Sequence, residues 1–165
     1  MSINFLWVYV WPMRSAPALL KVSFSFYPAD MGALHRHVAA LRKAGLPVRR
    51  ATVLRALIHQ ATPVQLFSYA ALLAEAQRQK AGPREADMIA DYPTVDLAPR
   101  DVAKLEATVT ELARAGLAGN RAFVVRALLR GLPRDANLVA IVQQFKRDCP
   151  DQPRGWAARK LQSRD

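Results

Sequence analysis

The sequence has little of several features that stabilise proteins or anchor them in membranes, and each shortage argues against one class of protein. Its 165 residues include one cysteine, Cys149, so no disulfide can form within the chain. That suits a reducing cytoplasm, where we expect the protein to be. No run of about 18 apolar residues, the length that spans a bilayer, is present. Aromatic residues make up only 8%, whereas Ala and Leu are abundant, which favours a helical fold.

Acidic residues are scarce relative to basic ones. The chain has 24 Lys and Arg against 13 Asp and Glu, a formal net charge of +11 at pH 7. Such an excess favours a polyanionic partner, either nucleic acid or an anionic membrane surface. Residues 21–60 carry a net charge of +6, whereas residues 92–132 carry +2. We therefore expect the first part of the chain to dominate the attraction.

The sequence also lacks a pattern of catalytic or metal-binding residues. His35 and His37 are two apart on an expected helix, so their side chains point about 200° apart, and His59 is isolated in sequence. One cysteine allows no zinc-site spacing, and no phosphate-binding Gly-Lys-Ser/Thr motif is present. We expect a binding protein without cofactor or metal ion, and not an enzyme.

The first 18 residues differ from the rest of the chain. Ile3–Trp11 is almost wholly apolar, and no basic residue precedes Arg14, as a secretory signal would require. A wrongly assigned start, with Met13 as the initiator, is an alternative to a signal segment. Residues 1–18 are therefore left out of the fold prediction.

The most informative feature is an internal repeat at an offset of 71 residues. Residues 26–59 align without a gap with residues 97–130, and 14 of the 34 aligned positions are identical. The identical positions include two runs, Ala-Gly-Leu (44–46 and 115–117) and Arg-Ala-Leu (55–57 and 126–128). Similarity at a fixed offset indicates a duplicated structural unit.

Each repeat begins with a predicted strand. Polar and apolar residues alternate in Lys21–Phe26 and in Tyr92–Leu97, which is typical of a strand that is buried on one face. Pro93 cannot donate to a ladder, so it should lie at the start or edge of its strand. The residues expected to face inward are Val22, Phe24, Phe26, Val95 and Leu97.

Two helices follow each strand. Pro28 and Pro99 suit a first helical turn, and an aspartate two places later adds a favourable charge there. Gly45 and Gly116 suit the left-handed position that ends the helix. For the second helix, Asn120 is a good N-cap, whereas the aligned Arg49 is a poor one.

An additional apolar pattern at helical spacing ends each repeat, and it predicts third helices over Pro63–Lys80 and Arg134–Arg147. The predicted organisation has five parts: an apolar N-terminal segment (1–18), unit 1 with its third helix (19–81), a linker (82–91), unit 2 with its third helix (92–150) and a basic tail (151–165).

A strand, a helix, a glycine turn and a second helix with arginine at its start resemble the ribbon-helix-helix family, over residues 21–59 and 92–130. In that family two strands pair into an antiparallel ribbon over four interlocking helices, and the ribbon enters the DNA major groove, as in the MetJ and Arc repressors. Two units in one chain resemble the TraY-type accessory proteins of plasmid conjugation. The resemblance implies a mainly α fold with a short two-stranded ribbon, a tandem pseudodimer with an extra helix after each unit.

The resemblance also implies the DNA-contacting residues. Base edges would be read by the outward strand residues, which are Lys21, Ser23, Ser25, Tyr92, Thr94 and Asp96. Phosphates would be held at the starts of the second helices by Arg49, Arg50, Asn120 and Arg121. Lys21 suits guanine acceptors, and Asp96 suits the cytosine amino group. Alternatively, if Ser23 lies opposite Thr94, Asp96 lies opposite Lys21 and forms an ion pair with it.

The expected function is sequence-specific binding of double-stranded DNA, as a transcriptional repressor or an accessory factor of plasmid maintenance or transfer. Because the two strands differ, the expected subsite is asymmetric, and two chains on adjacent subsites would raise the affinity. One alternative is a protein-binding regulator of antitoxin type that docks a partner through its apolar third helices. Another is a membrane-surface protein that is anchored by its apolar N-terminus.

Overall fold

The computed structural model describes residues 18–79, 89–134 and 136–149. Its elements, in chain order, are β1 (Leu20–Ser23), α1 (Pro28–Lys43), α2 (Arg50–Gln60), α3 (Pro63–Gln79), β2 (Thr94–Leu97), α4 (Pro99–Arg114), α5 (Arg121–Gly131) and α6 (Leu138–Asp148). The predicted class, mainly α with a two-stranded antiparallel sheet, is confirmed. The predictions for residues 1–17, for the tail and for most of the linker lie outside the described residues.

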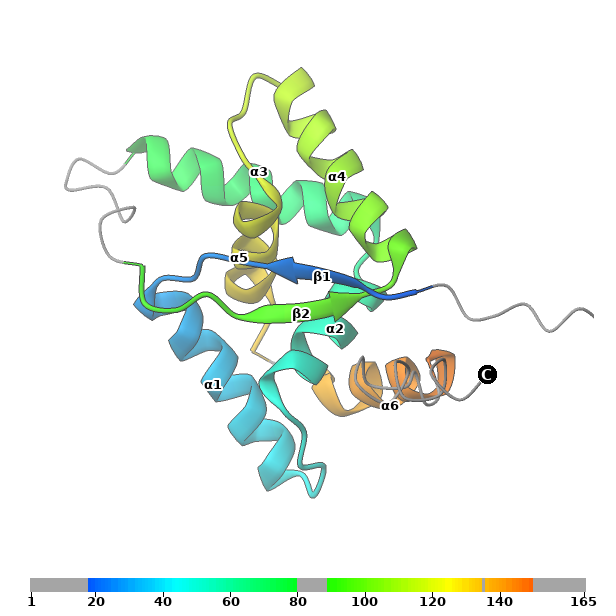
Figure 1. The fold of residues 1–165 in the computed structure, drawn as a ribbon. Helices are drawn as coiled ribbons and strands as arrows, with labels where there is room; N and C mark the ends of the chain where they lie inside the picture. Colours follow the sequence, from blue (N-terminus) through cyan, green and yellow to red (C-terminus); the bar gives the residue numbers. More distant parts are fainter. Residues whose placement is uncertain (1–17, 80–88, 135, 150–165) are drawn as a thin grey trace, which may run out of the picture.

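The two strands come from distant parts of the chain and pair antiparallel, in the middle of the view in Figure 1. The paired residues are Leu20 with Leu97, Lys21 with Asp96, Val22 with Val95, and Ser23 with Thr94. An isolated bridge joins Phe26 to Asp91 beyond the regular ladder.

Both strands are shorter than predicted, and Pro93 is the reason. The Phe24 N–H donates to the Pro93 carbonyl over 3.0 Å. Pro93 has no N–H to return, so this pair lacks its second ladder bond and β2 starts only at Thr94. Pro93 therefore lies immediately before β2, which agrees with the prediction that it occupies the start or the edge of its strand.

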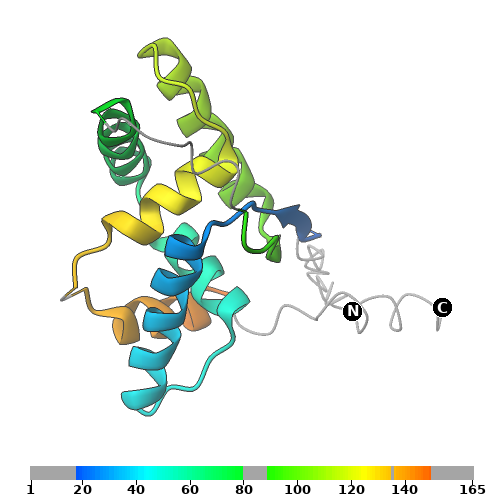
Figure 2. The same ribbon diagram turned by 90° about the vertical axis from the view of Figure 1, so that its left-hand side faces the viewer.

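One face of the sheet belongs to the hydrophobic core. The five residues that were expected to face inward are all buried: Val22, Phe24, Phe26, Val95 and Leu97. Figure 2 shows the sheet toward one side of the molecule, with the helices packed behind it. The opposite face of the sheet is thus directed outward.

The helix ends follow the local signals in the sequence. Pro28 and Pro99 are the first residues of α1 and α4. Gly45 and Gly116 have the predicted positive φ, at 79° and 72°. Asn137 accepts a hydrogen bond from the Ala140 N–H over 3.0 Å. Because of this cap, α6 starts at Leu138 and not at the predicted Arg134.

The two aligned aspartates, Asp30 and Asp101, were predicted only to add a favourable charge to a helix start. In the structure they also contact distant side chains. Asp30 is fully buried. It accepts hydrogen bonds from the Tyr27 N–H (2.8 Å) and from Nε of Arg130 at the end of α5 (2.6 Å). Asp101, which aligns with Asp30, is also buried and lies 3.3 Å from His59, which aligns with Arg130. Each aspartate therefore contacts the second helix of the opposite repeat.

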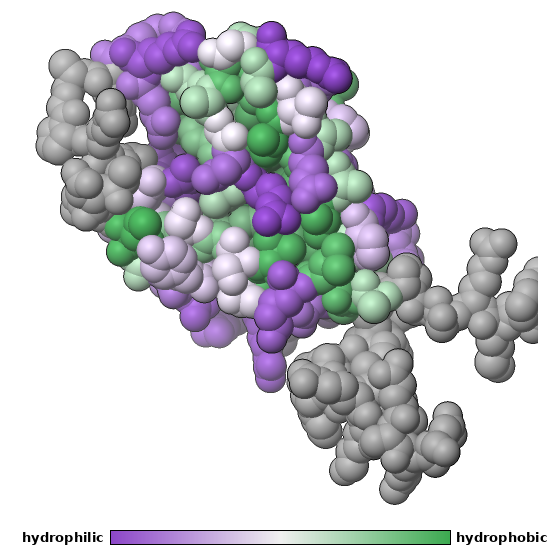
Figure 3. Space-filling view, turned by 45° about the horizontal axis from the view of Figure 1, so that its top comes forward, coloured by the Kyte–Doolittle hydropathy of each residue, from purple (hydrophilic) through white to green (hydrophobic). Residues whose placement is uncertain are grey.

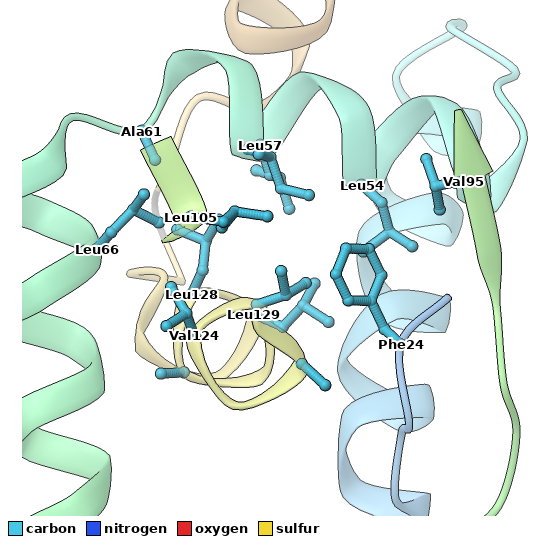
Figure 4. Packing of buried hydrophobic residues seen from close by; sticks show 14 of the residues in the cluster. Phe24, Leu54, Leu57, Ala61, Leu66, Val95, Leu105, Val124, Leu128 and Leu129 are labelled. Carbon is cyan, nitrogen blue, oxygen red and sulfur yellow. The ribbon is translucent and has the colours of Figure 1, made fainter. Parts of the chain in front are cut away.

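The buried side chains of both repeats form one continuous cluster. Figure 4 shows Leu66 of α3 and Leu105 of α4 beside Val124 and Leu128 of α5, with Leu57 of α2 near them. Helix α3 packs against α4 and α5, whereas α6 packs mainly against α2. Each third helix thus covers the second helix of the other repeat.

The close approach of α3 to α5 gives a packing prediction. A Cβ at Gly131 would lie 2.6 Å from Cδ1 of the Tyr69 ring. We expect Gly131→Ala to lower the free energy of unfolding by about 1–3 kcal/mol because the ring must shift. In the control Gly32→Ala, the new Cβ meets Arg36 at an ordinary 3.5 Å. That variant should gain about 0.5–1 kcal/mol, since Ala suits a helix better. Equal urea midpoints for the two variants would contradict this packing.

A half-buried histidine gives a pH prediction. Burial lowers the pKa of His37 from its ordinary 6.5, a hydrogen bond with the Leu129 backbone opposes the change, and Arg36 adds to it. Just below pH 6.5 the unfolded chain therefore binds more protons than the folded one. The free energy of unfolding should fall as the pH drops through this range. Urea unfolding at about pH 7.5 and about pH 5.5 should show a smaller fall for His37→Gln than for the exposed control His35→Gln.

Candidate nucleic-acid interface

The outward side chains of β1 and β2 form the candidate base-reading surface. Lys21, Ser23 and Thr94 are exposed, and Tyr92 just before β2 is 62% exposed. The other two predicted residues, Ser25 and Asp96, are half-buried. The register brings the residues of both strands together on one face.

The centre of this surface is a pair of hydroxyl groups. Ser23 Oγ and Thr94 Oγ1 are 2.9 Å apart, so one donates a hydrogen bond to the other. The two residues are 71 apart in sequence, which is also the offset of the repeat. Ser23 is therefore paired with the residue that aligns with it.

Lys21 and Asp96 are the charged pair of the surface. They are opposite one another in the register, as the alternative interpretation of Asp96 required. However, none of the ion pairs among the described residues joins them, nor does any of the hydrogen bonds. The predicted register is confirmed, whereas the predicted ion pair is not formed.

The start of α2 lies beside one end of the sheet. Nη1 of Arg50 is 3.6 Å from Asp91, the residue that bridges to Phe26. Arg49 is the exposed N-cap residue and makes no side-chain capping bond, as predicted. About half of each side chain in the Arg50–Asp91 pair is exposed, at 51% and 45%. Such a pair contributes little stability, so a phosphate can replace Asp91 at small cost.

At the start of α5, the two residues that were predicted to hold phosphates, Asn120 and Arg121, both contact other parts of the protein. The Asn120 side chain accepts the Phe123 N–H over 2.9 Å, so it caps the helix. Arg121 is exposed and lies 3.4 Å from Glu106 of α4. Asn120 is thus a confirmed N-cap, and its amide oxygen is already engaged.

Residues that the sequence analysis missed form a polar cluster around His59. The buried His59 ring lies 3.3 Å from Asp101 through Nδ1 and 3.2 Å from Asp148 through Nε2. This cluster joins α2, α4 and α6. The only sequence feature that pointed to this cluster was the alignment of Asp101 with Asp30, and it did not indicate which side chain either aspartate contacts.

Two further groups of this cluster have shifted pKa values. Burial lowers the pKa of Lys104, and the nearby Asp101 carboxylate opposes the change. Burial also raises the pKa of the Cys149 thiol, so the thiol is protonated and a weak nucleophile at neutral pH. Within the described part of the chain, no three His, Cys, Asp or Glu residues are grouped to hold a metal ion.

Arg126, one turn into α5, is buried and contacts two aromatic rings. Its guanidinium carbon lies 4.4 Å from the Tyr27 ring centre and 5.7 Å from that of Phe123. Its Nε and Nη1 have no hydrogen-bond partner. Arg126 therefore belongs to the packing of α5 against Tyr27, the residue just before α1, and not to the exposed surface.

The positive charge lies largely in the described part of the chain. It holds 17 of the 24 basic residues and eight of the 13 acidic ones, a net charge of +9. Figure 3 shows hydrophilic side chains at the top of this face and again across its middle, with hydrophobic ones between and below them. None of the described helices combines the length and the apolar character that crossing a membrane requires.

Comparison of the chain with protein-family models, curated proteins and solved structures found no match. Any functional proposal therefore rests on the sequence and on the geometry of the described residues.

The different helix starts give a stability prediction. Asn120→Ala should lower the free energy of unfolding by about 1 kcal/mol because the Phe123 N–H loses its partner. Arg49 occupies the aligned position without a capping bond, so Arg49→Ala should have almost no effect. Thermal unfolding of both variants measures the difference. A loss for Arg49→Ala equal to that for Asn120→Ala would contradict the assigned cap.

Proposed function

We propose that the chain is a tandem ribbon-helix-helix pseudodimer that binds double-stranded DNA through the outward face of β1 and β2. The observation that carries this proposal is the reciprocity of contacts between the two repeats. In a two-fold symmetric pair, if residue i of one unit contacts residue j of the other, then j of the first contacts i of the second.

The sheet and the buried aspartates both obey this rule. Leu20 aligns with Asp91, and Leu97 aligns with Phe26. The pairing of Leu20 with Leu97 therefore corresponds to the bridge between Asp91 and Phe26. Ser23 and Thr94 align with each other, so their pair corresponds to itself. The contact of Asp30 with Arg130 corresponds in the same way to that of Asp101 with His59. The packing of α3 on α5 corresponds to that of α6 on α2. A pseudo-two-fold axis through the Ser23–Thr94 pair accounts for all of these contacts.

The same geometry supports DNA as the ligand. A two-stranded ribbon fits the major groove, where donors and acceptors distinguish all base pairs. The ribbon presents hydroxyl, ammonium and carboxylate groups outward, and α2 starts beside one of its ends with Arg49 and Arg50 exposed. Free N–H groups at a helix start favour a phosphate. In this proposal Asn120 contributes through the helix start that it caps, and Arg121 exchanges Glu106 for a phosphate.

The biological role that we propose is that of a repressor or an accessory factor of plasmid maintenance or transfer. It acts in the cytoplasm and needs no cofactor. Because the repeats differ in charge, the first one supplies most of the attraction to DNA. Two chains can associate on adjacent subsites to raise the affinity.

A second candidate function is the binding of a protein partner through α3. Val64 and Leu72 are 75% and 68% exposed, and they lie about two turns apart on this helix. None of the exposed large apolar residues in the described part of the chain lies on α6, so α3 is the third helix that is available. Only these two large apolar side chains are exposed on the described part of α3, and we therefore rank this candidate second.

The DNA proposal is tested by titrating the full chain with mixed-sequence genomic DNA fragments over a salt series. Affinity should fall steeply with salt, because binding releases counterions. The Arg49→Ala/Arg50→Ala variant should bind more weakly and reduce the logarithmic salt slope by about 2. The control Arg42→Ala/Lys43→Ala makes the same charge change at the end of α1 and should leave the slope unchanged. Affinity without salt dependence would overturn the proposal.

A further inference from the structure

The outward face of the ribbon is chemically different at its two ends. The register puts Lys21 opposite Asp96 at one end and Ser23 opposite Thr94 at the centre. Hydrogen bonds from Phe24 to Pro93 and from Phe26 to Asp91 continue the antiparallel pairing, so Ser25 lies opposite Tyr92 at the other end. One end therefore carries a cation and an anion, and the other carries a hydroxyl group and an aromatic ring.

The charged end has unused hydrogen-bonding capacity. Lys21 and Asp96 are neighbours across the strands, yet no ion pair joins them. An ammonium group only donates hydrogen bonds, and a carboxylate only accepts them. The pair thus presents a donor and an acceptor side by side to whatever molecule approaches this face.

The major-groove edge of a G·C pair complements this arrangement. Guanine offers two adjacent acceptors, N7 and O6, and cytosine offers the N4 amino group as a donor on the far side. In an A·T pair the donor, adenine N6, stands between two acceptors instead. Because Lys21 and Asp96 come from separate strands, their groups suit an edge whose acceptors and donor occupy opposite sides.

We propose that Lys21 and Asp96 together read one G·C pair, with Lys21 on the guanine and Asp96 on the cytosine. This inference rests on the proposed DNA-binding function and specifies its target. The Ser25–Tyr92 end has no such charge pair and does not repeat the preference. The target is therefore non-palindromic, with a fixed orientation of its G·C pair relative to the chain.

The test is selection of bound duplexes from a library with about 14 randomised base pairs, using the full chain at about 0.15 M salt. The wild-type chain should enrich a non-palindromic sequence with G·C at one position. In competition binding, exchanging that pair for A·T should weaken binding about tenfold. Lys21→Gln or Asp96→Asn should abolish the G·C preference at this position and leave the rest of the selected sequence in place.

The sharpest variant exchanges the two charges. Lys21→Asp/Asp96→Lys keeps the net charge and the outward position of both groups, so neither folding nor nonspecific attraction should change. It should invert the selected pair from G·C to C·G while the neighbouring positions stay the same. A matched control, Glu111→Lys/Lys43→Glu, also keeps the net charge but lies on α1 and α4 away from the ribbon, and it should select the wild-type sequence.

The possible outcomes separate this inference from the function on which it rests. Inversion in the exchanged variant supports both. Two results would overturn the inference and leave sequence-specific binding intact. One is a palindromic enriched sequence. The other is an unchanged preference for G·C at this position in all three variants of Lys21 and Asp96. Failure of the wild-type chain to enrich any sequence overturns the sequence-specific function and the inference together. Thermal unfolding of each variant confirms that the folded chain was compared.

Discussion

The pairing of β1 with β2 is the constraint on which the rest of the structure depends. Neither strand has another partner among the described residues, and a lone strand leaves its backbone groups unpaired. Bringing Ser23 against Thr94 also brings α1 and α2 against α5, and α3 against α4 and α5. A unit of about 40 residues buries too little apolar surface to fold alone, and pairing within one chain solves this at a modest entropic cost.

The reciprocal contacts also reveal where the two repeats have diverged. Asp30 is paired with an arginine, which stays charged, whereas Asp101 is paired with a histidine within a larger polar cluster. Arg126 is buried against Tyr27, but the residue that aligns with Tyr27 is Ala98, which has no ring to offer Arg55. Arg55 instead lies over Phe145. The two halves therefore share a backbone plan with different side-chain contacts, which suits the proposed asymmetric DNA site.

Much of the fold could be predicted because its signals are local. Alternation located both strands, and the inward residues, such as Phe24 and Val95, are those that the pattern selected. Prolines, glycines and Asn120 located the helix ends. The start of α6 was misjudged because the cap at Asn137 was not recognised. The partners of Asp30 and Asp101 could not be predicted, since the side chains in contact are separated by 100 and 42 residues.

For the candidate site, the sequence alone determined which residues face outward and that the two halves differ in charge. Strand alternation and composition are properties of short segments, so they can be read without the fold. Only the tertiary structure decided that Lys21 and Asp96 are opposite one another but not bonded, and that Arg50 reaches Asp91 at the end of the sheet. Those relations depend on the register and on the packing of distant helices, because side-chain contacts are set by positions in space that no local pattern contains.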